Sequence, residues 1–558
     1  MITRRQALQG SGVVALAGLL AACGAGGGSL ASKPQGSVDI NPQPRDKVRD
    51  GGILRVPIDQ LPSNLNPGHV DGWCGALNTI DQAVLPYLFT ATADGGLAID
   101  PDYLTNAAIT STNPQVVTYT INPKARWSDG SPITYRDFAA NWQALNGTNP
   151  AYPIAGTTGY DDIVSVARGV DDQQVLVTFR RPYGEWKNLF FPLTPASLNS
   201  SPEAFSKAWQ TTIPVTSGPF TVQQIDQTAK TVTVARDPKW WGAPPKLDRI
   251  VFTVIDSAAM PDALANNELD IYSISSVDRL RRAQTTPGAV IRNAPSRTSY
   301  NITFNGAPGA TLADLQLRQA IAQGINREEV TRRIMGQITP NARPNGNHLY
   351  APGTKDYRDN ADALPYDPAK VQRTLDTLGW RRQGTGPNAP RAKDGKQLTL
   401  RLVYSEDPTN QNIVSTIQNQ LGLLGVTVTL VQADNSQFFP TYINRGNFDL
   451  GMFLWESVPG PFSSALGIYA RPLGDNVRQN YGRIGTPEID ALFAQGTAEL
   501  DDAKRAVLGN RVDRLIWHQA HSVILFTASG ADAVRTNVAN YGAHGFADPD
   551  YINAGFTK

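Results

Sequence analysis

Apolar residues change their spacing twice between Gln397 and Val431, and this change predicts a β-α-β unit. Alternation with polar residues is typical of a half-buried strand, and a spacing of three or four is typical of one helical face. The alternating sets and the helical set between them are Leu398, Leu400, Leu402; Ile413, Ile417, Leu421, Leu424; and Val426, Val428, Leu430. Parallel strands joined by a helix place ligands beyond their carboxyl ends, so we expect a site at Tyr404-Ser405-Glu406.

A second strand, predicted from Phe448 to Leu454, ends in the same way at Trp455-Glu456. Two strand ends that each supply an aromatic ring and an acid indicate a binding crevice. Such pairs also occur at ordinary sheet edges, so ligand contact and plain surface both stay open for Tyr404, Glu406, Trp455 and Glu456. Trp73, in a loop, is a further candidate for the wall of the site, although aromatic residues more often belong to a core.

Three helix starts are predicted from capping chemistry, in which a side-chain oxygen accepts a hydrogen bond from a free backbone N–H. The capping residues are Thr134, Asn326 and Asp367. An acid follows the first two at the third position, and Pro368 follows Asp367. These signals concern the fold and carry no chemistry.

The first 22 residues are predicted to be an export signal. Arg4 and Arg5 precede an apolar run from about Val13 to Ala22 that is too short to span a bilayer. The run ends in Leu20-Ala21-Ala22-Cys23, which looks like a bacterial lipobox. We therefore expect lipidation of Cys23 and attachment to the extracytoplasmic face of the cell membrane. Thr3-Arg4-Arg5-Gln6-Ala7-Leu8 resembles a twin-arginine signal, but Ala7 departs from that pattern, so the export route stays open.

Residues 23–50 read as a flexible tether, because Gly, Ser, Pro and Asn dominate after Cys23 and no apolar period occurs. The folded body is expected to begin near Gly51-Gly52, with a strand at Ile53-Leu54-Arg55-Val56. If Cys23 is acylated, Cys74 is the one remaining cysteine of the two, and no internal disulfide is possible.

Composition excludes several classes of function. The chain has 50 basic and 49 acidic residues, a net charge of +1, so nucleic acid is not an expected partner. No His-Glu-x-x-His, Walker-type loop or Gly-x-Ser-x-Gly elbow occurs, which argues against an enzyme. His518 and His521 have a spacing that suits a shared metal, but two ligands are too few for a closed site. We expect no catalytic residue, metal or cofactor.

Several segments together resemble the bacterial extracellular solute-binding proteins of family five, the peptide- and nickel-binding class that serves ABC transporters. An actinobacterial member is indicated. The most specific run is Trp127-Ser128-Asp129-Gly130-Ser131-Pro132-Ile133-Thr134. Other similar segments are Gly51 to Val56, Thr216 to Phe220, Arg236 to Gly242, Ile302 to Asn305, Leu317 to Ile321 and Tyr366 to Trp380. The resemblance extends over nearly all of the chain from residue 51.

The resemblance implies an α/β fold of the type II, cluster C periplasmic-binding-protein class, a two-lobe flytrap with an extra α+β domain. On this basis we expect lobe I at 51–90, 206–300 and 530–558, the extra domain at 91–205, lobe II at 301–529, and a hinge near Tyr300-Asn301. The implied function is a monomeric, lipid-anchored binding protein that captures a peptide-like solute between its lobes and delivers it to an ABC permease.

In peptide binders of this family an aspartate shortly after the Trp455-like strand end pairs with the peptide α-amine. Here Glu456-Ser457-Val458-Pro459-Gly460-Pro461 follows instead, and Glu456 is the nearest acid. Recognition of a free N-terminus is therefore open. One alternative is a same-fold lipoprotein that acts as a regulator or scaffold in cell-envelope glycolipid synthesis. A nickel chelate, haem or oligosaccharide ligand is another, although the five histidines do not favour a metal.

Overall fold

The computed structural model describes residues 37–558 except 73, 340 and 475. The predicted signal peptide, Cys23 and Trp73 lie outside the described residues. We name the parts of the molecule by their sheets. Lobe I carries the sheets β1-β10-β9-β8 and β11-β21-β12, the extra domain carries β4-β5-β7-β6, and lobe II carries β18-β17-β19-β13-β20.

Lobe I is built on a four-stranded sheet in which β1 runs parallel to β10 and the other neighbours are antiparallel. Its apolar side packs on α1, where Leu77 and Ile80 are fully buried. The elements of lobe I are β1 (Ile53–Ile58), α1 (Gly75–Val84), β8 (Phe220–Asp226), β9 (Thr231–Arg236), β10 (Arg249–Val254), α5 (Met260–Ala265), β11 (Ile271–Ser273), α6 (Val277–Thr285), β12 (Ala289–Asn293), β21 (Ala531–Arg535), β22 (Val538–Ala539) and β23 (Gly555–Phe556).

Residues 39–50 differ from the predicted tether, because they pack against the C-terminal segment. Asp39 forms a bridge with Ala543, Val48 forms one with Thr557, and the side chain of Val48 is fully buried. A short 3-10 helix, η1 (Arg45–Lys47), lies between them. The folded body thus begins near Asp39 rather than at Gly51. The sequence did not reveal this, because residues 39–50 are mostly polar or charged, pair through backbone groups and show no apolar period.

The extra domain is an antiparallel sheet covered by α2, with an aromatic core around Tyr119, Phe138 and Phe190. Both halves of the predicted capping box are present at Thr134 and Asp137. The elements are β2 (Phe89–Ala91), β3 (Leu97–Ile99), β4 (Leu104–Thr112), β5 (Gln115–Ile121), α2 (Tyr135–Leu145), β6 (Ile163–Arg168), β7 (Gln174–Phe179), η2 (Trp186–Asn188), α3 (Ala196–Asn199) and α4 (Pro202–Lys207).

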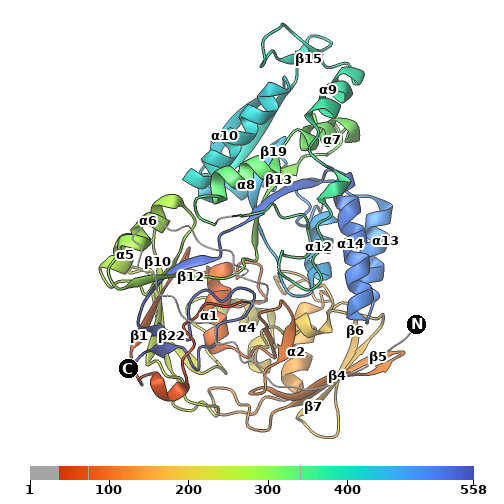
Figure 1. The fold of residues 1–558 in the computed structure, drawn as a ribbon. Helices are drawn as coiled ribbons and strands as arrows, with labels where there is room; N and C mark the ends of the chain where they lie inside the picture. Colours follow the sequence, from red (N-terminus) through yellow and green to blue (C-terminus); the bar gives the residue numbers. More distant parts are fainter. Residues whose placement is uncertain (1–36, 73, 340, 475) are drawn as a thin grey trace, which may run out of the picture.

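Lobe II confirms the predicted β-α-β unit, because β17 and β18 are parallel and α10 connects them. Figure 1 shows α7, α8, α9 and α10 around this sheet, and α12, α13 and α14 on the side that faces the extra domain. The elements are β13 (Thr298–Phe304), α7 (Leu315–Gln323), α8 (Arg327–Met335), η3 (Ala361–Ala363), α9 (Pro368–Thr377), β14 (Arg381–Arg382), β15 (Arg391–Lys393), β16 (Lys396–Gln397), β17 (Thr399–Ser405), α10 (Pro408–Leu423), β18 (Thr427–Ala433), α11 (Asn435–Gln437), the π-helix η4 (Phe438–Ile443), β19 (Leu450–Glu456), α12 (Pro461–Tyr469), α13 (Pro487–Ala498), α14 (Asp502–His518) and β20 (Ser522–Thr527). The side chains of Asn326 and Asp367 cap α8 and α9 as predicted.

The chain passes between the lobes twice in the described structure, at 294–297 and at 528–530. The two passages lie side by side, since the N–H of Ala294 donates to the carbonyl of Gly530 over 3.0 Å and that of Ala528 to Thr298 over 2.9 Å. The register of β13 against β20 shifts between Tyr300 and Asn301, where the sequence places the hinge. Hence the lobe connection consists of two short, hydrogen-bonded segments outside regular strands, next to an irregularity between β13 and β20.

Candidate ligand-binding site

A cavity of about 550 Å³ lies where the extra domain, lobe II and the lobe connection meet. A volume of this size suits a small organic ligand or part of a peptide. The walls comprise Asp94–Leu97, Ile109 and Gly184–Asn188 from the extra domain, Leu349–Ala351, Thr354–Asp356, Ser457–Pro461, Leu500–Ala503 and Arg505 from lobe II, Arg297 from the connection and Phe546 from lobe I. The lining mixes charged, polar and apolar groups, so it can contact both the backbone and the side chains of a peptide.

Glu185 joins the two sides of this cavity. Its buried carboxylate accepts hydrogen bonds from the backbone N–H groups of Phe462 at 2.8 Å and Ser463 at 2.7 Å, and from the Ser463 hydroxyl. These groups belong to the first turn of α12, whose N–H groups have no partner within the helix. A negative charge at this end is stabilised by the helix dipole. Burial raises the pKa of Glu185, and the hydrogen bonds from Ser463 and Phe462 oppose that rise.

Other contacts strengthen the same junction between the extra domain and lobe II. The Tyr183 hydroxyl lies 2.7 Å from the Ser463 hydroxyl, and the Asn188 side chain donates to the carbonyl of Pro459 over 2.9 Å. The N–H of Gly184 donates to the carbonyl of Thr497 over 2.7 Å. The two parts therefore touch through hydrogen-bonded backbone at one end of the cavity.

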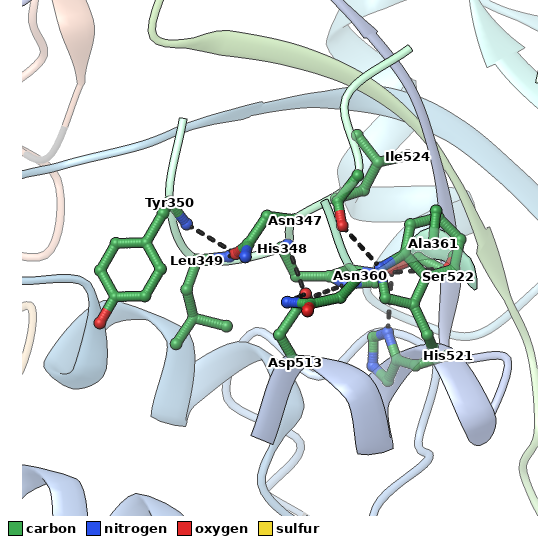
Figure 2. Close-up of polar contacts among 12 residues, drawn as sticks. Asn347, His348, Leu349, Tyr350, Asn360, Ala361, Asp513, His521, Ser522 and Ile524 are labelled. Carbon is green, nitrogen blue, oxygen red and sulfur yellow. Dashed lines mark hydrogen bonds and ion pairs between the residues drawn. The ribbon is translucent and has the colours of Figure 1, made fainter. Parts of the chain in front are cut away.

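A buried polar cluster holds the loop that carries Leu349, Tyr350 and Ala351 (Figure 2). His348 Nδ1 lies 2.6 Å from Asp513 Oδ1 on α14, and both side chains are fully buried. The backbone N–H of His348 donates to the same oxygen, and Asn360 donates to the other one. One carboxylate thus fixes both ends of the loop that forms part of the cavity wall.

The predicted strand ends are neighbours, because β17 and β19 are parallel, but their aromatic rings are on opposite faces of the sheet. Tyr404 pairs with Met452, so Trp455, three residues later, faces the other way. The Tyr404 ring is buried, and its hydroxyl donates to Gln411 on α10. Trp455 is half-buried and stacks on Tyr481 with ring centroids 6.0 Å apart. The two rings therefore lie on opposite faces of the sheet, and a crevice that both of them line stays a prediction.

The acids Glu406 and Glu456 are exposed, and neither is among the residues that line the cavity. Glu456 ends β19, where it pairs with Thr298, and the cavity wall begins at the next residue, Ser457. Contact of Tyr404, Glu406, Trp455 or Glu456 with a ligand stays a prediction. The wall residues at 184–188 and 349–356 had no signal in the sequence, whereas the Val458-Pro459-Gly460-Pro461 run is visible there as an unusual turn.

Within the described residues, no group of three or more His, Cys, Asp or Glu side chains could hold a metal ion. In the same part of the chain, no helix has the length and apolar character needed to cross a bilayer. The pair His518 and His521 does not form a joint site, because His521 is buried against Asn480 and Ser522 while His518 is exposed at the end of α14.

Comparison with known proteins gives three informative similarities. Residues 98–476 match the family described as bacterial extracellular solute-binding proteins, family 5 Middle. The oligopeptide-binding protein OppA of Mycobacterium tuberculosis is 42% identical over 523 residues, 93% of this chain and 87% of that protein. The probable monoacyl phosphatidylinositol tetramannoside-binding protein LpqW of the same species is 27% identical over 445 residues, 73% of this chain and 68% of LpqW.

Among solved structures, the periplasmic EDTA-binding protein EppA superposes with a TM-score of 0.85 over 95% of this chain and 100% of its own, at 24% identity. The agreement confirms the predicted α/β fold of the two-lobe periplasmic-binding class. At this identity the likeness concerns the fold and not the ligand.

Proposed function

Because the chain belongs to the bacterial extracellular solute-binding proteins of family 5, we propose that it binds oligopeptides outside the cytoplasm for an ABC importer. The family consists of binding proteins, so the chain is not an enzyme. The observation that carries the proposal is the 42% identity with OppA over 93% of the chain. The cavity between the extra domain and lobe II supplies a volume and a mixed lining that suit a peptide.

The proposal includes a membrane anchor and a partner. Cys23 carries a lipid that holds the protein at the outer face of the cell membrane, and a tether of a dozen or more residues separates it from the body. The lobes close on the peptide and the closed form docks on the permease. In support, only two short segments outside regular strands, 294–297 and 528–530, link the lobes in the described structure, and such a connection permits one lobe to turn against the other.

The test of ligand class is a thermal-shift screen of the mature chain with Cys23→Ser, which cannot be acylated. A ligand that binds the folded state alone at a hundred times its Kd stabilises it by about 2.7 kcal/mol, so we expect a rise of a few degrees in Tm with some peptides. If no peptide of two to about ten residues raises the Tm, oligopeptide binding is refuted.

A second candidate is a role in cell-envelope glycolipid synthesis, which the similarity to LpqW favours. The same screen should therefore include fragments of phosphatidylinositol mannosides. If these fragments raise the Tm and peptides do not, the importer proposal is refuted in favour of this second function. The anchor is tested separately, since Cys23→Ser should move the protein from the membrane fraction to the soluble fraction.

A further inference from the structure

A second cavity, of about 350 Å³, lies in lobe I between the first strand and the C-terminal segment. It shares no lining residue with the ligand cavity. Three arginines line it: Arg49 from the N-terminal segment, Arg55 from β1 and Arg535 from β21. Asp270 is the one acid in its lining, so the side chains that line this cavity carry a formal charge of +2.

The single carboxylate is already shared by two of the arginines. Asp270 Oδ2 lies 3.4 Å from Arg55 Nη1, and Asp270 Oδ1 lies 3.6 Å from Arg535 Nε. The Asp270 side chain is only 2% exposed and also accepts from the backbone N–H of Arg55 over 2.7 Å. It is therefore a fixed internal group that orients two guanidinium groups, and it is not free to neutralise a third.

Arg49 supplies the third guanidinium and has no acidic partner among the described residues. Its guanidinium carbon lies 5.1 Å from the centre of the Phe556 ring, a cation–π contact that holds the group beside the cavity. The nearest acid in sequence, Asp50, already forms an ion pair with Lys246, with 3.0 Å between Oδ1 and Nζ. Arg49 is thus oriented without being neutralised.

We propose that this cavity binds a phosphate group. Guanidinium forks match the oxygens of phosphate, and such charge-assisted bonds are stronger than neutral ones. Two asparagines, Asn267 and Asn537, line the same cavity and can donate to the remaining oxygens. A net charge of +2 beside low-dielectric walls attracts an anion and excludes cationic ligands.

The phosphate can come from a membrane lipid or from a free solute, and an anchor at Cys23 would keep the cavity within a limited distance of the membrane. Arg49 is 26 residues after Cys23, and the body is already packed at Asp39. The intervening stretch from Cys23 to Asp39 can extend at most about 55 Å. The lipid source thus rests on the proposed anchor, whereas the phosphate site itself does not.

The test uses the full mature chain with Cys23→Ser, inorganic phosphate as the probe, and constant ionic strength adjusted with chloride. We expect titration calorimetry to detect phosphate binding. Arg49→Gln should lower the phosphate affinity about tenfold, as expected for the loss of one charge-assisted hydrogen bond. The control is Arg249→Gln. Arg249 is exposed at the start of the neighbouring strand β10, and this substitution also removes one positive charge. Neither variant touches the ligand cavity, so peptide binding reports on folding.

Vesicle flotation then separates the two sources. Binding to phosphatidylglycerol vesicles but not to phosphatidylcholine vesicles, lost in Arg49→Gln and kept in Arg249→Gln, supports a lipid headgroup. Phosphate binding without vesicle binding supports a free phosphorylated solute. No phosphate binding, or equal loss in both variants, overturns the proposal and leaves the peptide function untouched.

Discussion

The carboxylate of Glu185 in the extra domain accepts the backbone N–H of Ser463 in lobe II at 2.7 Å, together with the Ser463 hydroxyl. The two residues are 278 positions apart, and they close one end of the cavity. A carboxylate that is buried at a helix N-terminus stabilises this contact between the extra domain and lobe II, and water would replace the helix as its partner if the two parts separated.

Glu185→Gln should therefore weaken ligand binding. The amide keeps the shape but removes the charge and presents N–H donors to the N–H groups of α12. Hydrogen bonds to charged groups contribute about 1.5–3 kcal/mol, so we expect at least a tenfold loss of peptide affinity in calorimetry. Glu203→Gln, an exposed acid on α4 paired with Lys207, is the control. Equal affinity in both variants would show that the junction does not contribute to binding.

Gly460→Ala tests the close approach of the same two parts. Gly460 has a φ of +70°, and an added Cβ would lie 2.1 Å from the side-chain nitrogen of Asn188. We expect weaker peptide binding and a larger radius of gyration in solution scattering with ligand present. Gly288→Ala is matched for backbone strain, because its φ is +74° and no atom lies within 4 Å of the added carbon. Only Gly460→Ala should change affinity.

Asp513→Asn should destabilise lobe II. The amide offers only one acceptor oxygen in place of the two that bind His348 and Asn360, and leaving a buried polar group without its partner costs about 1–3 kcal/mol. The control is Asp362→Asn, which removes an exposed ion pair to Arg514 on the same helix and should cost less than about 1 kcal/mol. Urea unfolding gives both values, and similar values for the two variants would contradict a structural role for the cluster.

His521 should make the protein less stable in acid. Burial, followed by the neighbouring charges of His348 and Arg318, lowers the pKa of His521 to about 3. Below about pH 6.5, His521 binds a proton in the unfolded state but not in the folded state. The free energy of unfolding therefore falls by about 1.4 kcal/mol per pH unit until pH 3.

The measurement for His521 is the difference in unfolding free energy between the parent and His521→Gln at pH 7, 6 and 5. This difference cancels the contributions of other groups, including Asp532, whose pKa is raised to about 6 by burial. His518→Gln, at an exposed position on α14, should follow the parent. A pH-independent difference for His521→Gln would contradict the lowered pKa.

Local sequence signals predicted local structure well. Thr134, Asn326 and Asp367 cap helices because capping depends on side chains within three residues of the backbone they bind. The β-α-β unit follows from the spacing of apolar residues alone. The motif at 127–134 was the most specific sign of the family. The relative facing of Tyr404 and Trp455 could not be predicted, since it depends on the pairing of Tyr404 with Met452, about fifty residues away.

The cavity walls could not be found in this way. Glu185 follows a strand in one domain and contacts a helix almost three hundred residues later, and no spacing rule connects them. Residues 39–50 were missed for a related reason, since they pair with a chain end more than five hundred residues away.

The pairing of residues 39–49 with the C-terminal segment puts both ends of the described chain in lobe I, and Figure 1 shows the C-terminus beside β1 and β22. Immobilisation on a sensor surface through the C-terminus or through a site near Asp39 would therefore hold lobe I and leave lobe II unattached. A fluorophore pair intended to test for movement between the lobes must accordingly place one dye within 298–527, because dyes near Asp39 and at the C-terminus would both report on lobe I.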